Sequence, residues 1–165
     1  MATEGRGIHV TEHTRVEAIG LLYEVARSIE NVLAPQLAAH GLPWLDGGVM
    51  IRLSRAPDHR LRMSDLAIQA ALSNSGLTRI VDRLEVAGLV RRESSATDRR
   101  VTYVALTKRG TERIVAVMPG QLERVEQIFI DVTEAEADAF LTTLAKIRDA
   151  ARAADAVRPD LVVAP

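Results

Sequence analysis

Apolar residues in the first third of the chain recur at spacings of three and four, which predicts two helices. The first runs from Thr11 to Leu33, with a stripe formed by Ala18, Leu22, Val25, Ile29 and Val32. Pro35 lacks an amide and clashes with the preceding turn, so we expect it to break or kink this helix. A second, short helix follows Gly41 and Pro43 and ends before Pro57. Gly47 and Gly48 are expected to weaken it. One face of this helix carries the apolar residues Leu45, Val49, Met50 and Leu53.

Two short helices joined by a tight turn are predicted in the middle of the chain. Ser64 is placed to cap the first, from Asp65 to about Leu72, and Ser73 to cap the second, from Asn74 to Ala87, which Gly88 ends. The second helix is amphipathic. One face carries Leu77, Ile80, Val81 and Leu84, and the free face carries Thr78, Arg79, Asp82 and Arg83.

The pattern then changes to that of strands. Residues 89–93 and 101–106 are rich in Val, Thr and Tyr and flank a polar turn at 94–100, which predicts a β-hairpin. Thr107 can cap a following helix, with a bend at Pro119 and Gly120 and an apolar period through Ile114, Met118, Leu122, Val125 and Phe129. Thr133 and Glu136 form a capping box for a last helix, whose stripe is Phe140, Leu141, Leu144 and Ile147. After Ala154 we expect an unstructured tail.

Composition favours one α-rich domain with helical extensions. The 165 residues are 47% hydrophobic, 26% charged and 3% aromatic, which argues against disorder and against an all-β sandwich. Cysteine is absent, so disulfides, thiol nucleophiles and sulfur-containing zinc sites are excluded. No apolar run has the length of a membrane span, and Met1 to Val10 carries charges where a secretory signal needs an apolar stretch. A cytoplasmic protein with no membrane partner is therefore expected.

Charge is distributed unevenly along the chain. The net charge is −1, yet Ile51 to Gly110 holds 12 arginines or lysines against 6 acids, while the flanks hold 9 against 16. Eleven of the twelve central cations are arginines, whose planar guanidinium suits phosphates and guanine edges. Nucleic acid is thus a candidate partner, and a solvated basic surface is the alternative.

A helix, a tight turn, a basic helix and a β-hairpin in this order make a winged helix-turn-helix. Its small crossing residue is Ala67, whereas Ala71 stands in the turn where glycine is usual. The sequence resembles the MarR family of bacterial transcriptional regulators, in order and spacing, through Leu61–Ala67, Ser73–Glu85, Gly88–Arg92, Asp98–Arg100 and Leu106–Thr107. The resemblance is specific from about Leu61 to Gly110 and looser in the flanking helices.

The resemblance implies a mainly α fold with a small β-hairpin wing and an obligate homodimer built by helices from both chain ends. The expected organisation is an N-terminal dimerisation helix (1–42), a winged helix-turn-helix domain (43–107), C-terminal dimerisation helices (108–154) and a flexible tail (155–165). It also implies repression that a small ligand relieves.

The candidate DNA contacts lie on the second central helix and at the hairpin tip. At the start and outer face of the helix, base edges and phosphates are within reach of Asn74, Ser75, Thr78, Arg79 and Arg83. Ser64 and Ser73 cap helices whose amides could bind phosphate. In the alternative interpretation this is a solvated face, with Asp82 and Glu85 paired to the arginines.

The hairpin tip gains its expected role from the family resemblance. That resemblance implies that Arg100 enters the minor groove, that Asp98 holds the Arg100 guanidinium and that Arg99 meets the backbone. In the alternative, the tip is merely a soluble turn.

The sequence offers a candidate effector site, and it offers only weak signals for a metal site or an active site. Trp44, the only tryptophan, is either core or one wall of a site for an aromatic or phenolic acid, with possible polar partners Tyr23, His40, Arg15 and Arg52. His9 and His13 have metal-binding spacing but no third ligand, so we expect no metal and no cofactor. No catalytic triad pattern is present, so an enzyme is not expected.

The sequence therefore predicts a homodimeric repressor that binds double-stranded palindromic DNA and is released by a small aromatic ligand. Two alternatives stay open. One is a DNA-architectural dimer that responds to no ligand, and the other is a winged-helix protein-interaction module, which would show no salt-dependent DNA binding.

Overall fold

The structure is a computed structural model, and it describes residues 14–95, 97–98 and 100–157. The chain divides into two compact units, 1–125 and 126–165, and the division falls inside one long helix. The elements are, in order, α1 (Thr14–Ala39), α2 (Trp44–Arg55), a 3-10 turn (Pro57–His59), β1 (Arg60–Arg62), α3 (Met63–Ala70), α4 (Asn74–Val86), β2 (Val90–Ser94), β3 (Thr102–Leu106), α5 (Lys108–Ile128) and α6 (Glu134–Val157). The predicted mainly α fold with a small winged sheet is confirmed.

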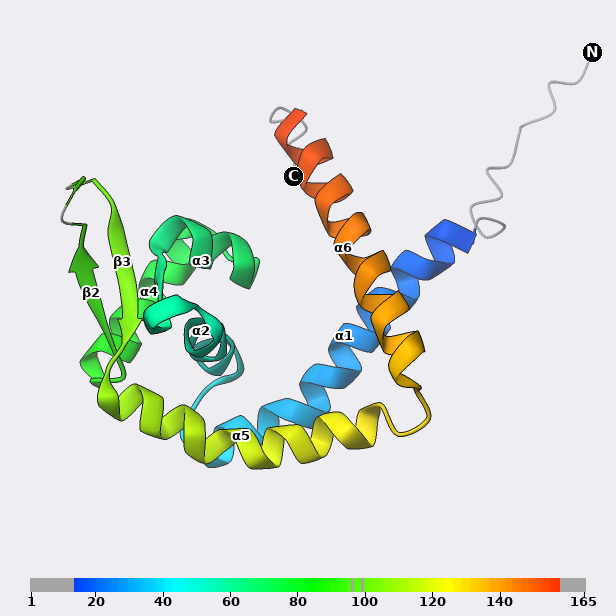
Figure 1. Ribbon diagram of the computed structural model, residues 1–165, viewed down its shortest axis with the longest axis horizontal. Helices are drawn as coiled ribbons and strands as arrows, with labels where there is room; N and C mark the ends of the chain where they lie inside the picture. The colour runs from blue at the N-terminus through cyan, green and yellow to red at the C-terminus, as the bar shows by residue number, and fades with distance from the viewer. Residues whose placement is uncertain (1–13, 96, 99, 158–165) are drawn as a thin grey trace, which may run out of the picture. The chain divides into compact units, whose positions relative to one another are not determined.

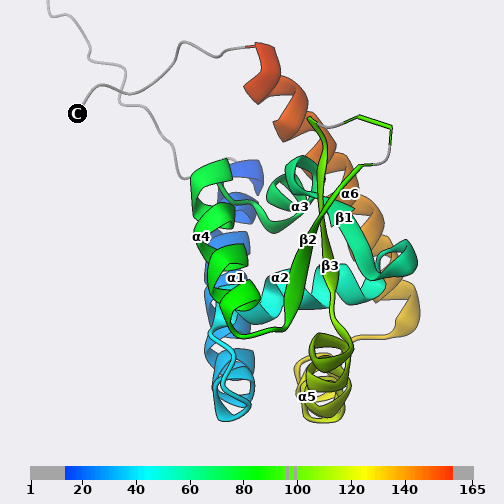
Figure 2. The ribbon, with the colours of Figure 1, turned by 90° about the vertical axis from the view of Figure 1, so that its left-hand side faces the viewer.

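The sheet of the first unit has three antiparallel strands in the order β1-β3-β2. β2 and β3 form the predicted hairpin, with Val90 opposite Leu106 and Ser94 opposite Thr102. β1 pairs with the other edge of β3, where Arg62 lies opposite Tyr103. Figure 1 shows the hairpin beside α4, and Figure 2 shows α2 crossing behind the strands. The third strand was not predicted, because three residues are too few to reveal an alternating pattern.

A single aliphatic core holds α2, α3 and α4 against the sheet. The predicted inner face of α4 is buried throughout, and so are Leu53 of α2, Leu66 of α3 and Val104 of β3. Each fully buried Leu or Val contributes about 1.5–3 kcal/mol relative to an exposed one. This packing sets the orientation of α4, so that its polar face lies outward.

Several predicted helix boundaries are confirmed by specific contacts. The Ser73 hydroxyl accepts a hydrogen bond from the Gly76 amide at 3.1 Å, and that of Thr107 from the Gly110 amide at 3.0 Å. Gly88 has a φ of +69°, as a glycine after a helix should. At the start of α6, the Glu136 carboxylate accepts from the Thr133 amide while the Thr133 hydroxyl accepts from the Glu136 amide.

Other local predictions were wrong. Ser64 does not cap α3: the helix begins at Met63, Arg62 occupies the N-cap position, and the Ser64 hydroxyl donates to the Asp65 carboxylate at 3.2 Å. Pro35 does not break α1, which continues to Ala39, and the kink that was its alternative stays a prediction. α6 extends to Val157, past the predicted end at Ala154, and residues 158–165 lie outside the described part of the chain.

Two helices have a residue that is unusual at its position, Ala71 at the C-cap of α3 and Gly47 inside α2. Ala71, which stands where glycine is usual, adopts the left-handed conformation itself, with φ 53° and ψ 43°. Gly47 lies close to α1, because a Cβ there would come within 2.7 Å of the Leu37 side chain, which is fully buried and would have to shift. This glycine permits the close approach of the two helices rather than simply weakening α2.

Candidate nucleic-acid interface

The outer face of α4 presents polar groups to solvent, as the sequence predicts. Asn74, Ser75, Thr78 and Arg79 are all exposed, and the Thr78 hydroxyl donates to the Asn74 carbonyl at 2.8 Å. Within the described residues, no hydrogen bond or ion pair engages the Arg79 guanidinium. The Ser73 and Ser75 hydroxyls lie 3.2 Å apart at the start of the helix. Arg79 is therefore available to an external partner.

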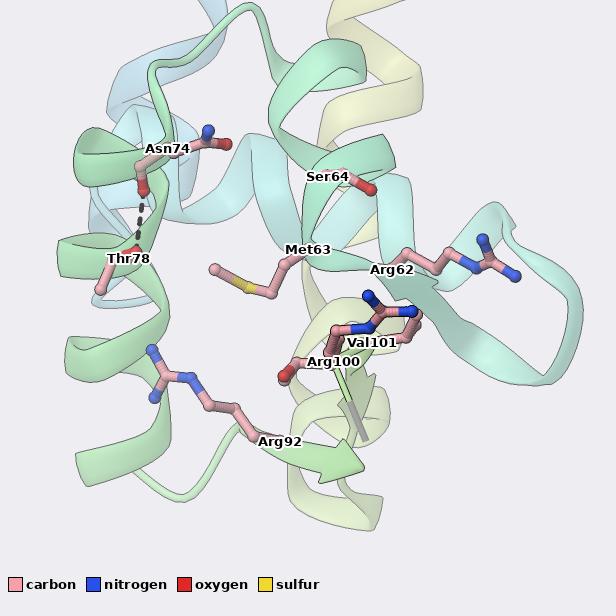
Figure 3. Close-up of a pocket in the computed structure, with 9 residues that line it drawn as sticks. Arg62, Met63, Ser64, Asn74, Thr78, Arg92, Arg100 and Val101 are labelled. Carbon is pink, nitrogen blue, oxygen red and sulfur yellow. Dashed lines mark hydrogen bonds between the residues drawn. The ribbon is translucent and has the colours of Figure 1, made fainter. Parts of the chain in front are cut away.

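An open groove of about 430 Å³ lies between α4 and the wing. In Figure 3, Asn74 and Thr78 line one side and Arg100 and Val101 the opposite side, with Met63 projecting between them. The described residues that line it are Arg62, Met63, Ser64, Asn74, Thr78, Arg92, Arg100, Val101 and Thr102. These include three arginines and no carboxylate. Sequence reasoning found four of these residues and missed Arg62, Met63, Arg92, Val101 and Thr102.

At the wing tip, the carboxylate of Asp98 orients the exposed side chain of Arg100. Asp98 Oδ1 accepts from the Arg100 amide at 2.9 Å and from the Arg100 Nε at 3.3 Å, while the Arg100 side chain is 92% exposed. The guanidinium is thus oriented without being covered. Arg99, the third predicted residue of the tip, lies outside the described residues.

Arg83 has a different environment from the other predicted DNA contacts. Its Nη2 lies 2.6 Å from Oδ1 of Asp46 on α2, and its Nε donates to Oδ2 at 3.4 Å. The Asp46 side chain is 6% exposed and that of Arg83 is 55% exposed. The hydrogen bond and charge of Asp46 raise the pKa of Arg83. This pair fastens α4 to α2.

The acids of α4 pair with the wing. Asp82 and Glu85, which the alternative interpretation paired with arginines of their own helix, both bind Arg92 of β2, through Nη2 at 2.6 Å and Nη1 at 2.5 Å respectively. Glu85 also accepts from the Arg92 amide at 2.9 Å. Arg92 therefore ties β2 to α4 at the base of the groove.

A second cavity, of about 250 Å³, lies at the junction of α1, α2, α3 and α5. Trp44 and Arg52 are among its walls, together with Leu33, Leu45, Gly48, Ile51, Ala70, Leu72 and Gln121. Burial, followed by the charge of Arg55, lowers the pKa of Arg52, whose guanidinium donates to the carbonyls of Gln69 and Gly48. Leu45, which the sequence places on the apolar face of α2, is half exposed at this cavity and not buried with the rest of that face.

The other predicted ligand residues lie elsewhere. Arg15 and Tyr23 are exposed on α1 and His40 follows its C-terminal end, outside the lining of this cavity. Gln121 was missed by sequence reasoning: it is 5% exposed, and its amide donates to the Leu33 carbonyl at 3.1 Å. No local signal marks it, because α5 reaches α1 from 88 residues away.

Neither a metal-ligand cluster nor a membrane-spanning helix is present in the part of the chain that the structure describes. There, no three His, Cys, Asp or Glu side chains gather as metal ligands, and His9 and His13 lie outside that part of the chain. Within the same residues, no helix is long and apolar enough to span a bilayer.

Comparisons with known proteins agree with this geometry. Residues 46–102 match the family model described as MarR family. The HTH-type transcriptional repressor YetL of Bacillus subtilis is 25% identical over 145 residues, which cover 82% of this chain and 87% of YetL.

Two solved structures from Streptomyces coelicolor are more similar. AbsC, a MarR family transcriptional regulator, has a TM-score of 0.75 and 31% identity, covering 86% of this chain and 97% of its own. Sco3205, a MarR family regulator solved in complex with DNA, has a TM-score of 0.70 and 30% identity, covering 93% and 94%. With this fold, this groove and these relatives, the chain belongs to the MarR family, whose members are transcriptional regulators and not enzymes.

Proposed function

We propose that this chain is a homodimeric repressor that binds a palindromic DNA operator through α4 and the wing. The groove between these two elements carries the proposal, since its lining, as far as the structure describes it, includes three arginines and no carboxylate. DNA is the polyanion that such a groove suits. The DNA complex of Sco3205 and the repressor name of YetL support the same assignment.

Different residues have different roles in this proposal. Asn74, Thr78 and Arg79 read base edges in the major groove, where short polar groups and arginine make specific contacts. Arg100 enters the minor groove, oriented by Asp98. The remaining polar groups, Ser64, Ser73, Ser75 and Arg99, meet the phosphate backbone and fix the register of the protein on the duplex.

The exposed apolar faces of the terminal helices support a homodimer. α1 has 26 residues, of which Leu37 alone is buried, and exposes Ile19, Leu21 and Tyr23. In the second unit, described by itself, α6 exposes Phe140, Leu141 and Ile147. Amphipathic helices need a partner for such faces. We assign dimerisation to 1–42 and 108–154 and DNA binding to 43–107, and two-fold symmetry then gives a palindromic operator.

Alanine substitutions at Arg79 and Arg100 are expected to weaken operator binding in different ways. Arg79→Ala should cost about 1–3 kcal/mol of binding free energy and relax preference at one position in each half-site, because a base contact is lost. Arg100→Ala should weaken binding to every operator variant that has the same minor-groove width. It should also lower the slope of log affinity against log salt by about one for each lost contact. Asp98→Ala should show a smaller loss than Arg100→Ala, since it frees the guanidinium without removing its charge. Affinity is measured across a salt series on a duplex selected from random DNA.

The same experiment separates the alternatives. A wild-type protein that binds selected and scrambled duplexes equally is an architectural DNA binder, and one without salt-dependent DNA binding is a protein-interaction module. If Arg100→Ala keeps wild-type affinity and slope, the wing does not enter the groove. A stoichiometry of two chains per operator is expected throughout.

We further propose that the effector is a small aromatic or phenolic acid bound in the Trp44 cavity. An apolar cavity of about 150 Å³ already holds benzene, so the 250 Å³ here can take one substituted ring. Arg52 offers a poorly solvated cation for the carboxylate, and the Trp44 indole offers a face for the ring. A ligand releases DNA by binding more tightly to a conformation that fits the operator poorly.

An aromatic acid at 100 times its Kd is expected to stabilise the protein by about 2.7 kcal/mol and to release the operator. Thermal shift across a panel of aromatic and phenolic acids measures the first effect, and quenching of Trp44, the only tryptophan, reports occupancy directly. Arg52→Gln should reduce the shift, whereas Tyr23→Phe, which lies outside the cavity, should not. No shift, quenching or release across the panel would favour a regulator without an effector of this class.

A further inference from the structure

One arginine of the groove lies outside both DNA-reading elements. Arg62 is the last residue of β1, directly before α3, and lines the groove together with Arg92 and Arg100. Its side chain is exposed, and Figure 3 shows it extending from the β1 end of the groove, on the far side from α4. The other two groove arginines are engaged by acids, Arg92 by Asp82 and Glu85 and Arg100 by Asp98.

A tyrosine of the neighbouring strand holds the Arg62 guanidinium. The Nε of Arg62 donates to the Tyr103 hydroxyl at 3.3 Å, and Cζ lies 5.9 Å from the centre of the Tyr103 ring. This bond uses Nε, and no hydrogen bond from the described residues engages the two Nη groups of the fork. Within the described residues no carboxylate forms an ion pair with Arg62, although Asp65 and Asp98 are near enough to act on its charge. The cation is therefore oriented and still available.

Arg60 provides an internal comparison. It lies two residues earlier on the same face of β1, and its Cζ is 5.3 Å from the same tyrosine ring. In contrast to Arg62, it forms ion pairs with Asp58 at 3.7 Å and with Glu93 at 3.6 Å, and it does not line the groove. Two arginines stacked on one tyrosine thus differ in pairing and in position.

We propose that Arg62 binds a DNA phosphate and extends the interface from α4 and the wing onto β1. Tyr103 is a positioning residue for this contact, because its hydroxyl and ring hold the guanidinium before DNA arrives. A preoriented arginine loses less side-chain entropy on binding than a free one. Since phosphates carry no base identity, the contact adds affinity and fixes register without changing sequence preference. This inference rests on the proposed operator binding.

The test is a salt titration of full-length wild type and the variants Arg62→Ala, Tyr103→Phe and Arg60→Ala, on a duplex selected from random DNA and on a scrambled duplex of equal length. Arg62→Ala should weaken binding to both duplexes by the same factor and lower the salt slope by about 0.9 for each lost contact. Between 50 and 200 mM NaCl, its defect relative to wild type should therefore shrink by about threefold for each contact. Tyr103→Phe should weaken binding less and keep the wild-type slope, because the charge remains. Arg60→Ala should leave both quantities unchanged.

Two results would overturn the inference. If the Arg62→Ala variant binds DNA with wild-type affinity and salt slope, Arg62 binds no phosphate. If the Arg60→Ala variant loses as much affinity as the Arg62→Ala variant, binding depends on the overall positive charge of the sheet and not on a contact at Arg62. Arg100→Ala, measured in parallel, separates the two levels of proposal. If it weakens binding while Arg62→Ala does not, operator binding stands and the β1 contact fails; if wild type shows no salt-dependent binding, the proposed function itself fails.

Discussion

Gly110→Ala is expected to lower the free energy of unfolding by about 3 kcal/mol or more, the upper end of the cost of overpacking a core. A Cβ at this position in the first turn of α5 would lie 2.0 Å from the Leu89 carbonyl oxygen and 3.0 Å from its carbon. That carbonyl cannot withdraw easily, because it accepts from the Thr107 amide at 3.0 Å and from the Thr107 hydroxyl at 3.2 Å. Urea unfolding followed by circular dichroism, at fixed protein concentration, measures the loss.

Gly20→Ala is the matched control for this prediction. Gly20 also lies within a helix, yet no heavy atom is within 4 Å of its Cβ position. Alanine there should stabilise the protein by about 0.5–1 kcal/mol, since glycine has the greater backbone entropy in the unfolded chain. Similar stability of the Gly110→Ala and Gly20→Ala variants would show that α5 approaches the Leu89 carbonyl less closely than the structure has it.

Arg83→Ala is expected to destabilise the fold by about 1–3 kcal/mol, because it leaves the buried Asp46 carboxylate without its partner. A fully buried pair would cost about 3–5 kcal/mol to break, and the half-exposed arginine reduces that figure since water can reach part of the site. Asp46→Asn in the same chain should recover part of the loss, because an amide tolerates burial better than an unpaired charge.

A double-mutant cycle of these two substitutions measures the coupling by urea unfolding. A coupling of zero would contradict the structural role of the pair. Unchanged stability of Arg83→Ala combined with weakened operator binding would restore Arg83 to the set of DNA contacts that the sequence predicts. The cycle thus decides between fastening α4 to α2 and binding DNA directly.

The helices and the hairpin could be predicted because each has a local signal. The hydroxyls of Ser73 and Thr107, the glycine after α4 and the capping box of α6 act within four residues of their own positions. The error at Ser64 has a longer-range cause. β1 pairs with β3 more than 40 residues away and carries the chain directly into α3, so Arg62 occupies the cap position.

The candidate site was predictable in part for a related reason. A helical period identifies the outward face of α4, yet it says nothing about which acid from another element meets which arginine. Asp46 is 37 residues from Arg83, and Arg92 is 10 residues from Asp82. Likewise Gln121 reaches the Trp44 cavity from α5. Such partners depend on tertiary packing, which overrides the pattern along a single element.

The ion pairs of Arg92 join the two elements that we propose to contact DNA, α4 and the wing, within one protomer. Because Arg92 of β2 binds both Asp82 and Glu85, these pairs hold the offset between α4 and the wing, and so, in the proposed complex, the offset between the major-groove and minor-groove contacts of one half-site. We therefore expect that inserting a base pair between these two contacts of a half-site weakens operator binding. Any adjustable distance in the proposed complex lies between the two half-sites, where the dimer, and through it a ligand, sets the spacing.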